Sequence, residues 1–185
     1  MPLTQLDPVS ALIVIDLQKG IVGFPVAHPI AEIVGKSAQL ARAFRERGLP
    51  VVLVNVSDRA PGRTDHGPFN FVFPPDWTEL VPELEQQPGD YLVTKKRVGA
   101  FIGTALDEYL HERGVTQVVL TGVATSVGVE ATARSAYDLG YNVTLVVDAM
   151  TDMRAESHQY SVQNVFPRIG ETGTTEDVLK QLSPA

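Results

Sequence analysis

Short, uninterrupted runs of apolar residues recur along the chain and predict strands. Four such runs lie at residues 11–15, 51–54, 118–120 and 143–147, and residues 91–94 add a fifth. Strands that are apolar at successive positions, rather than at alternating ones, are buried on both faces of a sheet. The pattern is therefore typical of a parallel sheet that helices cover on both sides.

Between these runs, apolar residues recur at helical spacing. The spacing predicts helices over residues 30–44, 104–113 and 126–139, each followed by a glycine stop at Gly48, Gly114 or Gly140. Residues 104–107 have the pattern of a capping box that opens the second of these helices.

The C-terminal part repeats this alternation. It predicts a helical stretch at 154–166, a short edge strand at 168–171 and a last helix at 174–182 that Thr174 caps. Strands alternating with helices predict an α/β fold: a three-layer α/β/α sandwich with a mostly parallel, Rossmann-like sheet of about six strands.

One segment interrupts the alternation. Residues 57–90 are rich in proline, glycine and aromatic residues, and loops of this length in compact domains tend to be lids or binding loops. No internal repeat, low-complexity tract or interdomain linker is found, so we expect residues 1–185 to form a single domain.

Composition excludes several classes of function. The chain has no cysteine, which rules out disulfides, thiolate metal sites, iron–sulfur clusters and a cysteine nucleophile. A net charge of −7 without a block of lysine or arginine argues against nucleic acid binding. No apolar run approaches the 18 residues of a membrane span, and the N-terminus lacks a signal peptide pattern. We therefore expect a soluble cytoplasmic protein.

Polar residues follow several predicted strands. In an open parallel sheet the ligand crevice lies beyond the carboxyl ends of the strands. This rule selects Asp16, Asn55, Lys95, the segment 121–128 and Asp148. Taken singly, each has an ordinary reading: an aspartate as a turn former or helix cap, a lysine as a solvated side chain, and Thr125 or Ser126 as a cap.

Together, three segments resemble the isochorismatase-like (cysteine hydrolase) superfamily. They read ALIVIDLQKG near the start, LVTKKRVGAFIGTALDEYL in the middle and VVLTGVATSVGVEATARSAYDLGYNVTLVVDAMTD toward the end. The resemblance covers nearly the whole chain and implies the isochorismatase-like hydrolase fold. It also implies a catalytic triad of Asp, Lys and Cys, whose positions here are Asp16, Lys95 and Gly128.

Glycine at position 128 removes the nucleophile that the resemblance implies. In the amidase branches of the superfamily a thiolate attacks a carbonyl, and glycine cannot do so. Isochorismatases proper similarly carry glycine there and hydrolyse a vinyl ether by acid catalysis. By resemblance, Asp16 is then the acid. An apolar wall of Ile15, Phe24 and Phe101 would raise its pKa, whereas Lys95 would favour the carboxylate or anchor a substrate carboxylate.

The resemblance further implies a non-proline cis peptide at Val123–Ala124 and an anion held by unpaired N–H groups at the start of the following helix. Arg59, Arg63 and His66 of the long loop could cover the pocket. We expect no cofactor. His28 and His66 could suggest a metal, but residues 55–59 lack the Asp-x-His cluster of zinc-binding relatives. The expected substrate-binding residues are Phe24, Asn55, Phe101, Val123, Ala124 and Thr125.

Three functions are therefore open. The first is a hydrolase that acts on a small carboxylated molecule without a covalent intermediate. The second is an inactive binding or structural protein on a cysteine-hydrolase scaffold, and the third is an amidase that uses Ser126 or Thr125 as its nucleophile. The expected partners are a small-molecule substrate and, by resemblance, further copies of the chain in a homodimer or higher homo-oligomer; nucleic acid and membranes are not expected.

Overall fold

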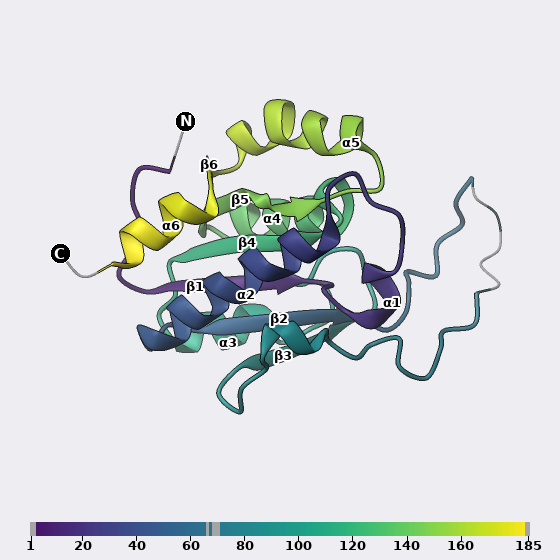
Figure 1. Cartoon of the computed structure of the whole chain (residues 1–185), viewed down its shortest axis with the longest axis horizontal. Coiled ribbons are helices and arrows are strands. Elements are labelled where there is room, and N and C mark those ends of the chain that lie inside the picture. Colours follow the sequence, from purple (N-terminus) through teal and green to yellow (C-terminus); the bar gives the residue numbers. More distant parts are fainter. Residues whose placement is uncertain (1–2, 66, 68–70, 184–185) are drawn as a thin grey trace.

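A six-stranded parallel sheet lies at the centre of the computed structural model, which describes residues 3–65, 67 and 71–183 (Figure 1). The strand order is β3-β2-β1-β4-β5-β6, and every neighbouring pair is parallel. The predicted three-layer α/β/α sandwich is thereby confirmed. The strands are β1 Ser10–Ile15, β2 Val51–Val56, β3 Tyr91–Lys95, β4 Gln117–Val123, β5 Asn142–Thr151 and β6 Glu171–Gly173.

The sheet separates two apolar layers of the core. Successive side chains of a strand point to opposite faces, so Ile13 and Ile15 of β1 enter one layer while Leu12 and Val14 enter the other. All six residues of β1 are buried. Burial on both faces explains why the strands appear in the sequence as unbroken apolar runs.

Helices cover both faces of the sheet. Buried residues of α2 Ile30–Glu46 and α6 Thr175–Leu182 pack in one layer, and those of α3 Leu106–Glu112 and α4 Glu130–Asp138 pack in the other. The remaining elements are the short helices α1 Lys19–Val22 and α5 Ala155–Tyr160, the 3-10 turns η1 Pro82–Leu84 and η4 Phe166–Arg168, and the π-helical turns η2 Thr125–Val129 and η3 Ser161–Val165. The elements α1 and η1 were not predicted from the sequence.

The two predicted N-terminal caps have different outcomes. At α6 the predicted cap by Thr174 is confirmed, and it forms a capping box with Asp177. At α3 the capping-box prediction is wrong, because the helix begins after Ala105 without a side-chain cap. There the Thr104 hydroxyl donates to the Ala100 carbonyl at 2.6 Å, and Asp107 Oδ1 accepts a 2.8 Å bond from the hydroxyl of Tyr141 instead.

Two C-terminal elements also lie elsewhere than predicted. The helical stretch 154–166 is divided into α5 and η3, and the edge strand lies at 171–173 rather than 168–171. The strand starts later because Pro167 stands in the first turn of η4, which extends the helical conformation to Arg168.

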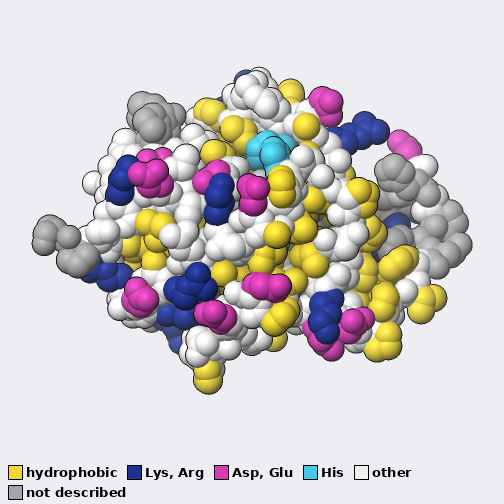
Figure 2. All heavy atoms as spheres, viewed as in Figure 1, with side chains coloured by type: hydrophobic (Ala, Val, Ile, Leu, Met, Phe, Trp, Pro, Cys, Tyr) yellow, Lys and Arg dark blue, Asp and Glu magenta, His cyan; other side chains and the backbone are white. Residues whose placement is uncertain are grey.

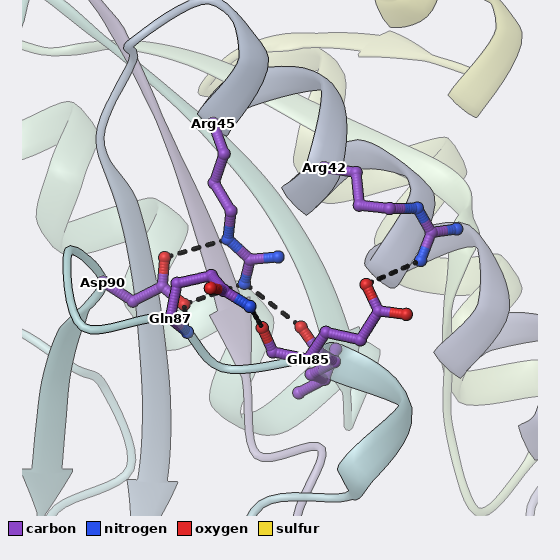
Figure 3. Close-up of polar contacts among 6 residues, drawn as sticks. Arg42, Arg45, Glu85, Gln87 and Asp90 are labelled. Carbon is purple, nitrogen blue, oxygen red and sulfur yellow. Dashed lines mark hydrogen bonds and ion pairs between the residues drawn. The ribbon is translucent and has the colours of Figure 1, made fainter.

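The described part of the 57–90 loop that follows β2 lies beyond the carboxyl ends of the strands, and the chain then runs back through η1 to residue 90, directly before β3 (Figure 1). Its return to the sheet is tied to α2 by an ion pair between Arg45 and Asp90 (Figure 3). Arg45 Nε donates to Asp90 Oδ1 at 3.0 Å and Arg45 Nη2 donates to Asp90 Oδ2 at 2.8 Å. The backbone amide of Gln87 adds a 2.7 Å bond to Oδ2, so both oxygens of this buried carboxylate are occupied.

The surface carries both signs of charge. Figure 2 shows lysine and arginine side chains interspersed with aspartate and glutamate on the face where α2 lies. No helix among the described residues is both long and apolar enough to cross a membrane.

Candidate active site

Asp16 and Lys95 meet at the carboxyl edge of the sheet. Asp16 directly follows β1, Lys95 ends β3, and the two strands flank β2. Lys95 Nζ lies 2.8 Å from Asp16 Oδ2, and the side chains are 3% and 7% exposed. The reading of Lys95 as a solvated side chain is therefore wrong, and so is the reading of Asp16 as a simple turn former.

The chain leaves β1 sharply at Asp16. Its φ is 52°, in the left-handed region that aspartate tolerates better than most residues. On the neighbouring strand, Gly122 has a φ of 116°, and a Cβ there would overlap the backbone of Ile15. Glycine thus allows β4 to approach the end of β1. The order of strands reverses at this junction, where ligands bind in open α/β sheets.

The Asp16 carboxyl has an unusual environment. Burial raises its pKa from 3.8 to about 6, and this effect outweighs the charge and hydrogen bond of Lys95, which lower it. Only Oδ2 is engaged by Lys95, whereas Oδ1 is buried and has no hydrogen-bond partner among the described residues. Lys95 Nζ also donates to the carbonyl of Arg97 at 3.3 Å.

Gly128 faces this carboxyl from η2. A Cβ built at position 128 would lie 3.3 Å from Asp16 Oδ2 and 3.2 Å from Ile15 Cγ2. The structure therefore brings together all three positions of the expected triad. At the third position only backbone is present beside the carboxyl.

The turn that carries Gly128 follows a cis peptide bond between Val123 and Ala124, as the resemblance implied. The predicted cap role of Thr125 or Ser126 is wrong, since Ala124 is the N-cap residue and no side chain caps the turn. Instead, the amide and the hydroxyl of Ser126 both donate to Asp152 Oδ2, at 2.7 and 2.8 Å.

One N–H donor of the expected anion site at this helix start is already engaged, and anion binding by the rest of the turn stays a prediction. The N–H group of Ser126 is bound by the protein's own Asp152, which is 4% exposed. A substrate anion would have to displace a buried carboxylate in order to use that donor.

A second contact holds the same turn. The Thr125 hydroxyl, fully buried, lies 2.8 Å from His158 Nδ1 of α5. The ring of His158 lies 4.7 Å from that of His28, and the Nδ1 of His28 lies 2.9 Å from the hydroxyl of Thr151. Burial and the proximity of His28 lower the pKa of His158, while Asp152 opposes this shift.

Asp152 and His158 were not among the predicted site residues. The apolar run 143–147 placed the strand end before Asp148, but β5 continues to Thr151. Asp148 lies inside the strand, accepts a bond from the amide of Thr175 at 2.7 Å and pairs with Lys36 at 3.0 Å. The buried residues at 149–151 continue the apolar pattern and were the available signal for the true strand end.

Three other predicted residues surround the site less directly. Asn55, 5% exposed, donates through Nδ2 to the Thr78 carbonyl at 2.8 Å. Phe24 is 42% exposed and packs edge-on to Trp77, and Phe101 is buried with its ring 6.0 Å from that of Tyr141. Substrate contact by these side chains stays a prediction.

No group of three or more histidine, aspartate or glutamate side chains that could hold a metal ion occurs among residues 3–65, 67 and 71–183. Of the residues considered for metal or for covering the pocket, His66 lies outside the described part of the chain, and Arg59 and Arg63 lie in the long loop.

Comparisons with known proteins bear on the family and the fold of the chain. The family model described as "Isochorismatase domain" matches residues 10–177. The uncharacterized isochorismatase family protein YwoC of Bacillus subtilis (strain 168) is 42% identical over 180 residues, which cover 94% of each chain. The phenazine biosynthesis protein PhzD of Pseudomonas fluorescens is 30% identical and covers 94% of this chain and 87% of its own. A solved isochorismatase family protein from Burkholderia thailandensis has a TM-score of 0.92 at 42% identity and covers 96% of this chain and 97% of its own.

Proposed function

Since the chain belongs to the isochorismatase family, we propose that it is a hydrolase of small carboxylated molecules that works by acid catalysis from Asp16, without a covalent intermediate. One observation carries this proposal: a buried carboxyl with one oxygen on Lys95 and the other unpartnered among the described residues, beside a glycine.

The geometry supports a proton on Oδ1 of Asp16. Lys95 donates to Oδ2 and requires an acceptor there, so a proton on the neutral carboxyl occupies Oδ1. Oδ1 is also the oxygen without a partner in the described structure, which leaves it able to donate to a substrate. A pKa of about 6 suits an acid that must release and regain a proton near neutral pH.

The reaction of a vinyl ether then balances with these groups and water. Asp16 Oδ1–H protonates the enol-ether carbon, and an oxocarbenium ion forms. Water adds to the cationic carbon and returns a proton to the Asp16 carboxylate, and the resulting hemiketal collapses to a carbonyl compound and an alcohol. The ammonium of Lys95 stabilises the transient carboxylate.

Lys95 also suits a carboxylated substrate. Its ammonium has three N–H donors, of which Asp16 and the Arg97 carbonyl use two in the described structure. The third is available to a substrate oxygen. The absence of cysteine from the sequence excludes a thiol nucleophile, and acid catalysis of this kind needs none.

Isochorismate turnover tests the proposal. We expect the wild type to convert isochorismate, and Asp16→Asn to lower kcat by about a hundredfold or more, because an amide cannot transfer the proton. Asp90→Asn is the matched control, since it alters another buried carboxylate outside the site, and it should keep the wild-type kcat. No turnover by the wild type, undiminished turnover by Asp16→Asn, or a covalent adduct seen by intact-mass spectrometry during turnover would contradict the proposal.

The contact between Ser126 and Asp152 favours a second candidate, an inactive binding or structural protein. There the protein's own carboxylate occupies the helix start that would otherwise hold a substrate anion. On this reading, Gly128→Cys would gain amidase activity and the wild type would hydrolyse no member of a panel of small carboxylates and amides. Hydrolysis of any member by the wild type would remove this candidate.

The geometry disfavours an amidase with a hydroxyl nucleophile. Thr125 is fully buried against His158, and the Ser126 hydroxyl donates to Asp152. A stable acyl adduct on either residue would be its required signature.

A further inference from the structure

The turn that faces Asp16 is held from outside by the segment after β5. Ser126 is bound through its amide and hydroxyl to Asp152, and Thr125 is bound through its hydroxyl to His158 of α5. The same segment is tied to the loop before α2, where the Ala27 amide donates to the Asp152 carbonyl at 2.8 Å. These contacts join three parts of the chain at one turn.

Thr125 and Gly128 belong to one turn of helix. η2 runs from Thr125 to Val129, so both residues lie within a single π-helical turn, and the amides of Val127 and Val129 both donate to the Ala124 carbonyl at 3.1 Å. A displacement of Thr125 is therefore transmitted to Gly128. The backbone of Gly128 in turn sets the space beside Asp16 Oδ2.

The Thr125 hydroxyl determines which form of His158 the turn requires. His158 Nδ1 is its hydrogen-bond partner, and no other acceptor for that buried hydroxyl occurs within the described part of the chain. The hydroxyl therefore donates to Nδ1, which must be unprotonated, and the ring carries its proton on Nε2.

We propose that His158, acting through Thr125, is a positioning residue that holds the 125–128 turn against Asp16 only while its imidazole is neutral. Protonation converts Nδ1 from an acceptor into a donor and leaves the buried Thr125 hydroxyl without an acceptor. An unsatisfied buried hydroxyl is unfavourable, so the turn is expected to shift. The catalytic consequence of this inference rests on the proposed function, whereas the coupling between His158 and the turn does not.

The surroundings of His158 determine its charge. Burial has the largest effect and lowers the pKa of His158, and the ring contact with His28 lowers it further. Asp152 opposes this shift, and the net result is a lowered pKa, which favours the neutral ring. The other charged groups that line the adjacent cavity are Glu32 and Lys36 of α2 and Asp148 of β5, and the charged residues on or beside the helix of His158 itself are Arg154 and Glu156.

The two groups therefore need opposite protonation states. Asp16 acts as an acid only while it is protonated, so turnover falls as the pH rises above about 6. His158 holds the turn only while it is neutral, so turnover also falls on the acid side. The profile of kcat/KM against pH is then bell-shaped, with His158 responsible for its acid limb.

Backbone amide NMR of the 185-residue chain tests the coupling without any substrate. The titration is performed in an Asp16→Asn background, so that Asp16 does not contribute. We expect the amide resonances of Ser126 and Gly128 to shift with the same apparent pKa as the His158 ring. Adding Thr125→Val, which removes the hydroxyl while keeping the shape of the side chain, should leave the ring titrating and abolish the amide response. The inference would be overturned if the amide resonances of Ser126 and Gly128 did not shift with the His158 titration. It would also be overturned if they shifted equally in Thr125→Val.

Steady-state kinetics of two His158 variants distinguish a positioning role of this residue from a purely structural one. His158→Asn retains a hydrogen-bond acceptor near Nδ1 but does not titrate, so it should keep kcat near neutral pH and lose the acid limb. His158→Phe keeps a ring without an acceptor and should lower kcat about tenfold with little change in KM, as small misplacements of catalytic groups do. Retention of the acid limb in His158→Asn would contradict the inference.

The two proposals can fail independently. If amide coupling is found but isochorismate is not turned over, the positioning contact stands and the proposed function fails. If isochorismate is turned over with an Asp16-dependent base limb but the amides of Ser126 and Gly128 do not follow His158, the proposed function stands and the inference fails.

Discussion

Two buried ion pairs in this protein use their carboxylates differently. Asp90 is paired with Arg45 through both oxygens, and the backbone amide of Gln87 adds a third bond (Figure 3). Asp16 is paired with Lys95 through Oδ2 alone, and its Oδ1 has no partner in the described structure. The side chains of Asp90 and Asp16 are 2% and 7% exposed, so burial does not distinguish them.

The choice of cation accounts for the difference. Guanidinium is a planar fork that matches both oxygens of a carboxylate, whereas ammonium is a compact charge that engages one. A carboxylate with protein donors on both oxygens ties a loop to a helix and has no oxygen left unengaged. The carboxyl of Asp16 keeps one oxygen without a partner in the described structure, and that is a property of a group that acts on a ligand.

Removing the charge of Asp90 should give the largest change in stability. Asp90→Asn leaves Arg45 without its partner, and breaking such a pair should lower the free energy of unfolding by about 3 kcal/mol. Urea denaturation measures the loss, with kcat measured well below the transition as the control. A drop in kcat comparable to that of Asp16→Asn would show that the two pairs do not differ in role.

Filling the space beside Asp16 should impair catalysis more than folding. In Gly128→Ala the new Cβ would lie 3.3 Å from Asp16 Oδ2 and 3.2 Å from Ile15 Cγ2, so these neighbours must shift by a few tenths of an ångström. We expect kcat for isochorismate to fall about tenfold or more. Gly35→Ala, in α2, is the matched control because a Cβ there meets nothing within 4 Å. Equal kcat values for the two variants would contradict the proposed role of Gly128.

Replacing the cation of the Asp16 pair should move the pH profile. Lys95 lowers the pKa of Asp16, so Lys95→Met should raise it above 6 and shift the base limb of kcat/KM upward by about one pH unit or more. The sign follows from the acid role: a higher pKa keeps Asp16 protonated to a higher pH. Lys96→Met, at the exposed neighbouring position, should leave the limb unchanged. A base limb that stays in place or moves downward in Lys95→Met would exclude Asp16 as its origin.

A cap remote from both ion pairs should give the smallest effect. Thr174→Ala removes the capping box of α6 and should lower the free energy of unfolding by about 1 kcal/mol. Turnover should be unchanged, since α6 contributes no residue to the site. Thermal denaturation and isochorismate kinetics on the same samples check both expectations, and altered kinetics would extend the functional region beyond the carboxyl edge of the sheet.

Local patterns predicted most of the fold. Apolar runs located all the strands of the sheet except the short β6, because strands that are buried on both faces are apolar at most positions. The cap of α6 was predictable because all of its partners lie within four residues. The box at Thr104 has the same pattern but does not form, since Tyr141, 34 residues away, takes the Asp107 carboxylate. A local signal fails where a distant side chain competes for the same group.

The candidate site was predictable to a smaller degree. The strand-end rule and the resemblance pointed to Asp16 and Lys95, and the resemblance to Gly128. The contacts of Ser126 with Asp152 and of Thr125 with His158 span 26 and 33 residues, so no pattern in the sequence indicates them. They showed that one N–H donor of the predicted anion site is bound by the protein's own carboxylate.

The sequence by itself determined the order of strands and helices, the absence of a thiol and the presence of an acid and a cation at two strand ends, because these depend on residue type and on periodicity along the chain. Only the tertiary structure decided the surroundings of the Asp16 carboxyl and the contacts of its two oxygens. Which of its oxygens meets Lys95, how strongly burial raises its pKa and what holds the turn opposite it depend on distances between segments far apart in the chain. Hydrogen bonds and desolvation act over a few ångströms in space, and their energies are set by packing rather than by sequence order.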